Sequence, residues 1–344
     1  MSSSDVQEMD VDLETVRRKY AEERDKRLKS EGNEQYIEVT GEFSYFIEDP
    51  YVDPDSPPAP ITEHVEVAII GGGFGGLLTA VELVEAGITD LRIIEKGGDF
   101  GGTWYWNRYP GVACDMESYI YLPLLEETGY MPRNRFAGGQ EIMDHCKRIA
   151  KQWSLYEKTK FQSEVSSMTW NDETNRWHID TKAGDKIDAH FVVMANGPMH
   201  RPKLPGIKGI NSYKGHTFHT SRWDYDYTGG DSTGKLTKLK GKRVGIIGTG
   251  ATAVQCIPHL AEHADHLFVF QRTPSSVDYR NDRPTDEEWF KSQPSGWQKY
   301  RMDNFNTLTT GGIAPEDLVN DGWTEIMRTV GAAMMAGSGD VSSP

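Results

Sequence analysis

The feature that most constrains the fold is the glycine-rich turn GGGFGG (71–76), which has the spacing G-x-G-x-x-G. HVEVAII (64–70) before it predicts a buried strand, LLTAVELVEAG (77–87) after it predicts a helix, and LRIIE (91–95) predicts a second strand. A strand, a tight glycine turn, a helix and a strand make a βαβ unit, whose helix N-terminus faces the pyrophosphate of a dinucleotide. The chain is therefore expected to fold as an α/β protein.

An acidic residue, Glu95, ends the second strand of this unit, 19 residues after Gly76. A carboxylate at this position accepts hydrogen bonds from a ribose 2′-hydroxyl, and it would repel a 2′-phosphate. The first site is therefore expected to bind FAD or NAD rather than NADP. Its expected cofactor contacts are Gly71, Gly73, Phe74, Gly75, Gly76 and Glu95.

A second glycine turn, GTGATA (248–253), has Ala in place of the third glycine and again lies between a strand pattern, RVGIIG (243–248), and a helix pattern. The next strand pattern, HLFVFQR (266–272), ends in arginine and carries no acid. Because a guanidinium can pair with a 2′-phosphate, this site is expected to bind NADPH, although a surface ion pair is the other interpretation of Arg272. The expected contacts are Thr249, Gly250, Ala251, Thr252, Ala253, Val254, Gln255, Arg272 and Thr273.

One FAD-type site and one NADPH-type site together predict a flavoprotein that takes hydride from NADPH. Pyridine-nucleotide disulfide reductases share this layout, but they need a redox-active cysteine pair. Cys114, Cys146 and Cys256 are widely spaced, and no C-x-x-C or C-x₄-C pattern occurs. Molecular oxygen is the natural alternative electron acceptor.

The charge and the cysteine content exclude several other classes. The net charge is −15, and residues 1–65 contribute −10 of it with 17 acidic and 7 basic residues. This acidity argues against a nucleic-acid partner. The three cysteines suit neither a disulfide framework nor metal-ligand spacing, so no metal is expected. No apolar run approaches the ~18–20 residues that cross a bilayer, so no membrane insertion is expected and the protein is placed in the cytoplasm.

The chain is expected to divide into four parts. Residues 1–65 form an acidic N-terminal extension with one helix, over about 13–29, and a proline-rich linker at 50–60. That helix is interpreted as a solvated surface helix, with a partner-binding helix as the alternative. Residues 66–205 form the first part of an FAD-binding domain, 206–240 a linker, and 241–344 an incomplete NADPH-binding domain.

The segment YKGHTFHTSRWD (213–224) between the two units resembles the fingerprint of type I Baeyer–Villiger monooxygenases, with Tyr213 where Phe is usual. Related flavin N-hydroxylating and S-oxygenating enzymes typically end this motif in Tyr or Phe, so Trp223 favours the Baeyer–Villiger class. The resemblance implies that His219 and Trp223 are functional residues of a linker that couples the two nucleotide domains. Without it, His219 would be interpreted as a packed or hinge histidine.

A second resemblance to the same family is carried by GGTWYWNRYPGVACD (101–115). It implies that Thr103 to Trp106 lie along the flavin. It also implies that Asp115 lies beside the isoalloxazine and the nicotinamide, where its carboxylate orients an active-site arginine. The implied FAD contacts in and around this block are Thr103, Trp104, Tyr105, Trp106, Ala113, Cys114, Asp115, Tyr121 and Val165.

The resemblance implies two Rossmann-like domains, the second inserted in the first, after an N-terminal helical extension of the kind that longer family members carry. It also implies an activity: with FAD and NADPH, one oxygen of O2 is inserted next to the carbonyl of a ketone, giving an ester or lactone. A bulky or polycyclic ketone is the implied substrate. A flavin N- or S-oxygenating monooxygenase is the alternative enzyme.

Two parts that the resemblance implies are not found in the sequence. One is the active-site arginine, which relatives carry well beyond the Arg272 position, and the other is a late strand that closes the FAD domain. The sequence is therefore expected to be a C-terminally truncated form, or to be completed by another chain. An inactive nucleotide-binding remnant stays open as an interpretation, and the sequence does not indicate an oligomeric state.

Overall fold

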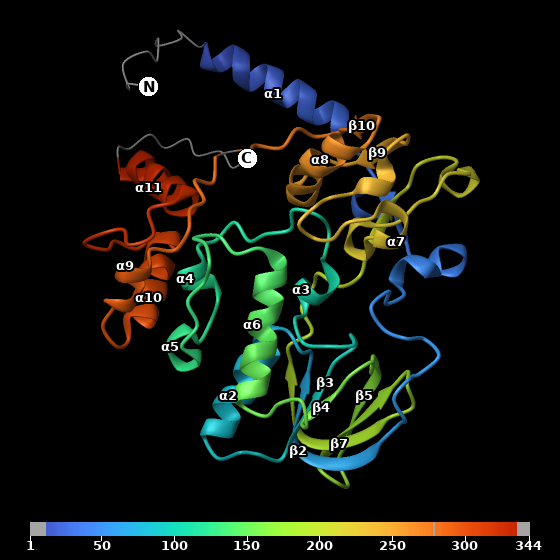
Figure 1. Ribbon diagram of the computed structural model, residues 1–344, viewed down its shortest axis with the longest axis vertical. Helices are drawn as coiled ribbons and strands as arrows, with labels where there is room; N and C mark the ends of the chain where they lie inside the picture. The colour runs from blue at the N-terminus through green and yellow to red at the C-terminus, as the bar shows by residue number, and fades with distance from the viewer. Residues whose placement is uncertain (1–11, 278, 336–344) are drawn as a thin grey trace.

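A computed structural model describes residues 12–277 and 279–335 of the chain (Figure 1). Residues 1–11 of the expected N-terminal extension and residues 278 and 336–344 of the expected NADPH domain lie outside the described residues. No helix in the described part is both long and apolar enough to cross a membrane.

A six-stranded sheet forms the centre of the first unit, with the strand order β4-β3-β2-β7-β6-β5. The four strands from β4 to β7 run parallel, and β7, β6 and β5 pair antiparallel. The apolar run of β2 is buried because this strand is central in the sheet. In sheet order, the strands are β4 (Thr159–Lys160), β3 (Leu91–Ile94), β2 (Thr62–Ile70), β7 (Lys186–Met194), β6 (Arg176–Thr181) and β5 (Val165–Asn171).

Two helices, α2 (Phe74–Glu85) and α6 (Gly139–Gln152), lie on one side of this sheet (Figure 1). Leu77 of α2 and Ile149 of α6 share a fully buried cluster with Ile69 of β2. The sequence analysis predicted α2 and not α6, whose buried residues recur at helical spacing: Ile142, Met143, Cys146, Ile149 and Ala150.

The second βαβ unit consists of β9 (Arg243–Ile247), α8 (Ala251–His263) and β10 (His266–Phe270). Its two strands are parallel, and they pair from His266 and Arg243 onward. The α/β class, the two Rossmann-like units and the N-terminal helical extension predicted from the sequence are confirmed, consistent with a second unit inserted in the first.

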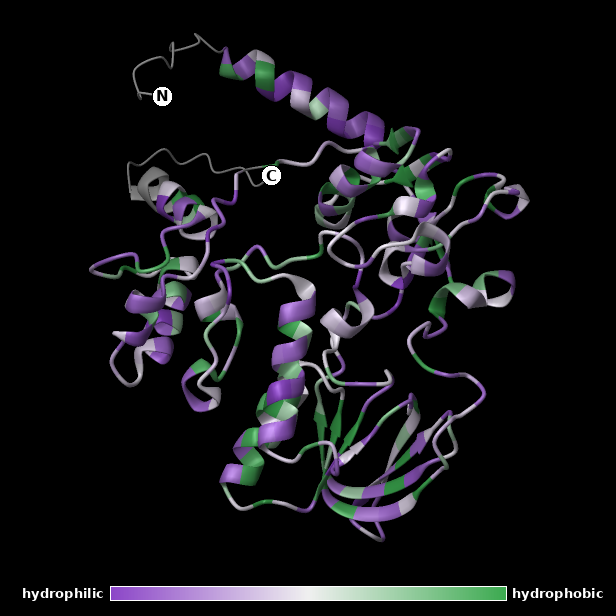
Figure 2. Ribbon diagram, in the orientation of Figure 1, coloured by the Kyte–Doolittle hydropathy of each residue, from purple (hydrophilic) through white to green (hydrophobic). Residues whose placement is uncertain are grey.

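The N-terminal extension carries helix α1 (Leu13–Arg27), which has no buried residue and is hydrophilic along most of its length (Figure 2). The Asp12 carboxylate caps this helix by accepting hydrogen bonds from the amides of Glu14 and Thr15. Further along, β1 (Tyr36–Glu38) pairs antiparallel with β8 (Lys203–Pro205). The extension is therefore paired with the last residues of the expected FAD-binding part, 66–205.

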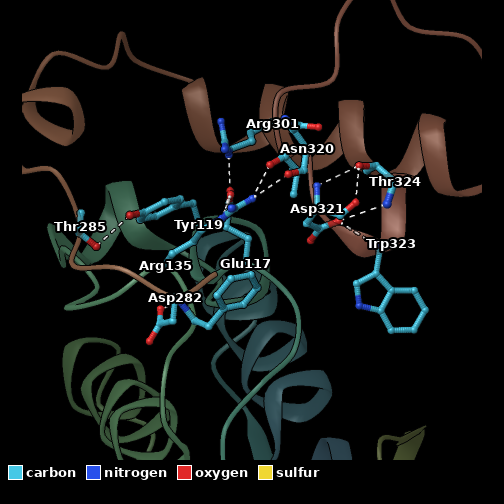
Figure 3. Close-up of polar contacts among 12 residues, drawn as sticks. Glu117, Tyr119, Arg135, Asp282, Thr285, Arg301, Asn320, Asp321, Trp323 and Thr324 are labelled. Carbon is cyan, nitrogen blue, oxygen red and sulfur yellow. Dashed lines mark hydrogen bonds and ion pairs between the residues drawn. The ribbon is translucent and has the colours of Figure 1, made fainter. Parts of the chain in front are cut away.

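Three helices follow Arg283, where the sequence pattern is weak: α9 (Glu287–Lys291), α10 (Trp297–Thr309) and α11 (Gly322–Met335). A buried ion-pair cluster holds α10 to the first unit (Figure 3). The Glu117 carboxylate accepts from Arg135 at 3.2 Å and from Arg301 of α10 at 2.6 Å.

The remaining helices are short. They are α3 (Thr103–Trp106), α4 (Ser118–Tyr121), α5 (Leu125–Thr128) and α7 (Tyr225–Thr228), with 3₁₀ turns at Gly32–Gln35, Gly41–Ile47, Ile210–Ser212, Thr220–Arg222 and Thr237–Leu239.

Candidate active site

A cavity of about 540 Å³ opens at the carboxyl ends of β2, β3 and β7, where Ile70, Ile94 and Met194 line it. This is the edge of a parallel sheet at which α/β proteins bind nucleotides. Ten of the residues expected to contact FAD line this cavity: Gly71, Gly73, Phe74, Gly75, Glu95, Thr103, Trp104, Trp106, Tyr121 and Val165.

The first glycine turn has the geometry that close approach of a phosphate requires. Gly71 has φ +113°, and a Cβ on Gly76 would lie 1.9 Å from the carbonyl oxygen of Gly71. The turn therefore accepts no side chain at Gly76, which packs helix α2 onto the strand and does not line the cavity. The first amide groups of α2 lack intrahelical acceptors, and Gly73, Phe74 and Gly75 of this turn line the cavity.

Glu95 lies in the cavity wall with 5% of its surface exposed. Its two carboxylate oxygens accept hydrogen bonds from the amides of Gly72 at 2.5 Å and Gly97 at 2.6 Å. Burial raises the pKa of this carboxyl, and the two amide bonds oppose that effect. Each oxygen keeps a further lone pair, so Glu95 can still accept from a ribose hydroxyl.

Aromatic side chains form another wall. The indole of Trp104 in α3 donates a 3.0 Å hydrogen bond to the Tyr121 hydroxyl, and the Tyr121 ring meets Phe74 edge-on at 5.8 Å. Trp106 lies under the guanidinium of Arg222, 4.0 Å from its ring centre. The wall is thus an aromatic surface of edge-on rings, against which a planar ring can pack.

Lys96, Glu164 and His200 also line the cavity, although they belong to none of the motifs used in the sequence analysis. Lys96 and Glu164 form an ion pair at 3.6 Å. Burial lowers the pKa of Lys96. His200 has a buried ring nitrogen, Nδ1, without a hydrogen-bond partner among the described residues. Only the position of Lys96, directly after the expected ribose acid, could have signalled any of them from sequence.

Four other expected FAD contacts lie outside this cavity. Tyr105 is buried, and its hydroxyl donates to Asp49 at 2.7 Å. Cys114 is also buried, and burial raises its pKa to about 11, so it is a neutral thiol. Ala113 contacts the second unit. Asp115 is exposed, and its backbone N–H bonds to the Cys114 thiol.

The residues of the second glycine turn lie around the N-terminus of α8. Gly250 caps this helix, and Ala253 is buried against the core. The Thr249 hydroxyl donates to the carbonyl of Thr273 at 3.1 Å, which joins the turn to the end of the next strand. Arg272, which follows β10, is exposed.

The two units meet where the characteristic block 101–115 contacts α8. The Gln255 amide donates to the carbonyl of Ala113 at 3.0 Å and accepts from its N–H at 3.4 Å. A Cβ on Gly111 would lie 2.6 Å from the carbonyl oxygen of Gln255. Gln255 and Ala113, which were both expected to contact cofactors, thus join the two sites.

His219 does not line the cavity. Its Nδ1 accepts the N–H of Ser221 at 3.1 Å, so a neutral ring carries its proton on Nε2. Burial, and then the positive charge of Arg222, lower its pKa to about 4. The imidazole is therefore neutral near pH 7.

Trp223 is 3% exposed and belongs to the large core between the two units. Its indole donates to the Thr228 hydroxyl at 3.1 Å. Arg222 lies between His219 and Trp223 in the sequence. It donates to the carbonyls of Glu48 and His200, and its guanidinium covers the Trp106 ring. The fingerprint therefore ties the linker to the cavity wall and to the N-terminal extension.

An α/β fold with two dinucleotide turns, one beside a buried acid and one beside an exposed arginine, is typical of oxidoreductases that bind two nucleotides. Residues 68–291 match the family model described as pyridine nucleotide-disulphide oxidoreductase. The chain belongs to this family, and within it to the type I Baeyer–Villiger monooxygenases. Its three cysteines are all buried and free.

Relatives and solved structures agree with this membership. Baeyer–Villiger monooxygenase ATR8 of Stachybotrys chlorohalonatus is 53% identical over 96% of this chain and 53% of that protein. Polycyclic ketone monooxygenase from the thermophilic fungus Thermothelomyces thermophila is 43% identical, with a TM-score of 0.86 over 91% of this chain and 54% of that one. OTEMO in complex with FAD and NADP is 33% identical, with a TM-score of 0.62 over 73% and 46%. The chain spans about half the length of the curated relatives it matches.

Proposed function

We propose that this protein uses FAD and NADPH to insert one oxygen atom of O2 next to the carbonyl of a ketone, giving an ester or lactone. The observation that carries the proposal is the cavity at the sheet edge, which combines the glycine turn, the buried Glu95 and the wall of Trp104 and Tyr121. The relatives' names support ketones over amines and thioethers as substrates.

The residues fit FAD at the first site. The turn from Gly71 to Gly76 carries a side chain only at Phe74, which leaves room for a pyrophosphate, and the buried Glu95 would accept from a ribose hydroxyl. The orphaned Nδ1 of His200 supplies a polar group that still needs a partner. Bound FAD would supply the redox chemistry and the activation of O2, which no side chain can supply.

The second site fits NADPH, because Arg272 is exposed at the end of β10 beside Thr249 and Thr273. The guanidinium would hold the 2′-phosphate. The chain's own contribution is to orient the two nucleotides toward each other across the contact between Gln255 and Ala113.

Asp115, His219 and Trp223 have different roles in this proposal. The exposed Asp115 carboxylate would hold and orient a cationic side chain beside the reacting carbonyl, where developing negative charge needs it. Arg280 donates at 2.9 Å to the carbonyl of Cys114, the residue before Asp115, so a cationic side chain already lies near Asp115. His219 and Trp223 are positioning residues, because both are fixed in the linker outside the cavity.

The substrate class proposed here is a bulky or polycyclic ketone, by similarity to polycyclic ketone monooxygenase. We further propose that the protein works in the cytoplasm. Three free buried cysteines suit a reducing compartment.

A reduction and turnover experiment tests the proposed function. The chain is titrated with FAD, and NADPH is added without oxygen while flavin absorbance is followed. Air is then admitted with a polycyclic ketone, a tertiary amine or a thioether. We expect stoichiometric flavin, faster reduction by NADPH than by NADH, and product from the ketone alone. A protein that takes up no flavin, or that oxygenates only the amine or the thioether, would contradict the proposal.

A further inference from the structure

Arg272, the expected partner of the 2′-phosphate, contacts the N-terminal extension. Its Nη1 donates to the side-chain oxygen of Gln35, and its Nη2 donates to the Tyr36 hydroxyl at 3.3 Å. These two residues lie more than 230 positions earlier in the chain. The extension therefore reaches the part of the second site that is expected to hold the 2′-phosphate, the group that NADPH has and NADH lacks.

The backbone holds Gln35 and Tyr36 in place independently of Arg272. Tyr36 begins β1, whose register pairs it with Pro205 of β8. The carbonyl of Gln35 accepts from the N–H of Gly206 at 3.0 Å. Just beyond them, Val39 and Phe46 of the extension share a buried cluster with Leu204. The backbone thus holds the two side chains beside the guanidinium.

The chemistry of this wall suits an anion site. An acid beside Arg272 would compete with a phosphate for the guanidinium, whereas the Gln35 amide and the Tyr36 hydroxyl are neutral. Each of them both donates and accepts hydrogen bonds, so each can accept from Arg272 in the free protein and donate to a phosphate oxygen beside it.

We propose that Gln35 and Tyr36 complete the subsite for the 2′-phosphate of NADPH, so that the N-terminal extension helps to select NADPH over NADH. This proposal rests on the assignment of NADPH to the second site. Gln35 and Tyr36 are specificity-determining residues in it, and they take no part in the chemistry at the flavin.

The test measures binding of the distinguishing fragment alone. The full chain, saturated with FAD so that its first site is filled, is titrated calorimetrically with adenosine 2′,5′-bisphosphate and with 5′-AMP. In Tyr36→Phe and Gln35→Met, we expect Kd for the bisphosphate to rise about tenfold, the change that one lost hydrogen bond to a charged group produces. Kd for 5′-AMP is expected to stay within about twofold.

Tyr45→Phe is the matched control. Tyr45 lies on the same extension, and its hydroxyl contacts Thr217 at 3.3 Å rather than Arg272. This variant should bind both fragments like the unchanged chain. Thermal unfolding of each variant checks that the extension stays folded.

The outcomes separate the two proposals. If Arg272→Ala removes the preference for the bisphosphate while Tyr36→Phe and Gln35→Met keep it, the role of the extension is overturned and the NADPH assignment stands. If the unchanged chain binds both fragments equally, the NADPH assignment fails and the inference fails with it. An equal loss of both fragments in Tyr36→Phe would also overturn the inference.

Discussion

At the scale of single residues, membership of a sequence motif does not determine whether a residue lines the cavity. Gly76 and Tyr105 belong to motifs that predict FAD contacts, yet one packs a helix onto a strand and the other anchors Asp49. Lys96 and His200 line the cavity without belonging to any motif. A motif reflects the local requirements of a turn. The cavity is lined by side chains from segments that come together only in the folded chain, so a motif cannot identify all of them.

Arg272 carries a prediction about cofactor choice. Arg272→Ala removes the only guanidinium assigned to the 2′-phosphate, so Kd for NADPH should rise about 10- to 100-fold, as for loss of a charge-assisted pair worth about 1.5–3 kcal/mol. Kd for NADH should change by less than about threefold. Stopped-flow flavin reduction at varied cofactor concentration measures both. Arg243→Ala, which removes a cation from β9 of the same unit, is the control, and equal effects of Arg272→Ala on NADPH and NADH would remove the assignment.

The lowered pKa of His219 predicts that the free energy of unfolding depends on pH. Its pKa is lowered from 6.5 to about 4, so folding favours the neutral ring. The stability that this provides is complete above about pH 6.5 and is lost as the pH falls from there toward about 4. Between about pH 7.5 and 5.5 the loss amounts to about 1.4 kcal/mol.

The variant His219→Asn tests this dependence, because its side-chain oxygen can still accept from Ser221 and cannot take up a proton in this range. Urea unfolding at the two pH values should show a loss of stability about 1.4 kcal/mol smaller than in the unchanged chain. His266→Asn, at an exposed position, should behave like the unchanged chain. An unaltered pH dependence in His219→Asn would show that His219 does not control it.

At the scale of elements, segments with strong periodicity were predictable. The strands and helices of both βαβ units begin and end within a few residues of their expected positions, because an apolar run, a glycine turn and an amphipathic run follow each other without interruption. Helices α6 and α9 to α11 were not predicted. The apolar residues of α6 recur at helical spacing, so the signal for that helix was present and was missed. Helix α10 lacks such a clear pattern, and its Arg301 attaches it to the buried Glu117.

The turn before α2 gives a prediction at this scale. In Gly76→Ala the new Cβ would lie 1.9 Å from the Gly71 carbonyl oxygen, so the free energy of unfolding should fall by about 2 kcal/mol or more. Gly75→Ala in the same helix meets only Ala195, at 3.6 Å, and should leave stability unchanged or raise it by up to about 1 kcal/mol. Urea denaturation measures both, and equal stability of the two variants would contradict the packing described here.

At the scale of the whole molecule, contacts between distant segments determine the arrangement. The extension reaches Arg272, the linker covers Trp106, and the C-terminal helices dock on Glu117. Each of these contacts joins residues far apart in the sequence and produces no local sequence pattern. The sequence therefore predicted the two units and their cofactors but not how the parts are joined.

The docking of the C-terminal helices carries the prediction at this scale. The Glu117 side chain is 2% exposed and pairs with Arg135 and Arg301 (Figure 3). Glu117→Gln leaves two buried guanidinium groups without a counter-charge, which should cost about 3–5 kcal/mol. Thermal and urea unfolding measure it, and Asp303→Asn, which breaks an exposed pair with Lys299, should change little. Equal effects of the two variants would mean that the cluster does not hold the helices.

The central proposal is that this protein transfers one atom of O2 to a ketone. The most direct test supplies FAD, NADPH, a polycyclic ketone and ¹⁸O2, and analyses the product by mass spectrometry. The account predicts a lactone with a single ¹⁸O atom in the ring ester position. NADPH consumption that yields only hydrogen peroxide, or recovery of unlabelled ketone from a chain loaded with both cofactors, would contradict it.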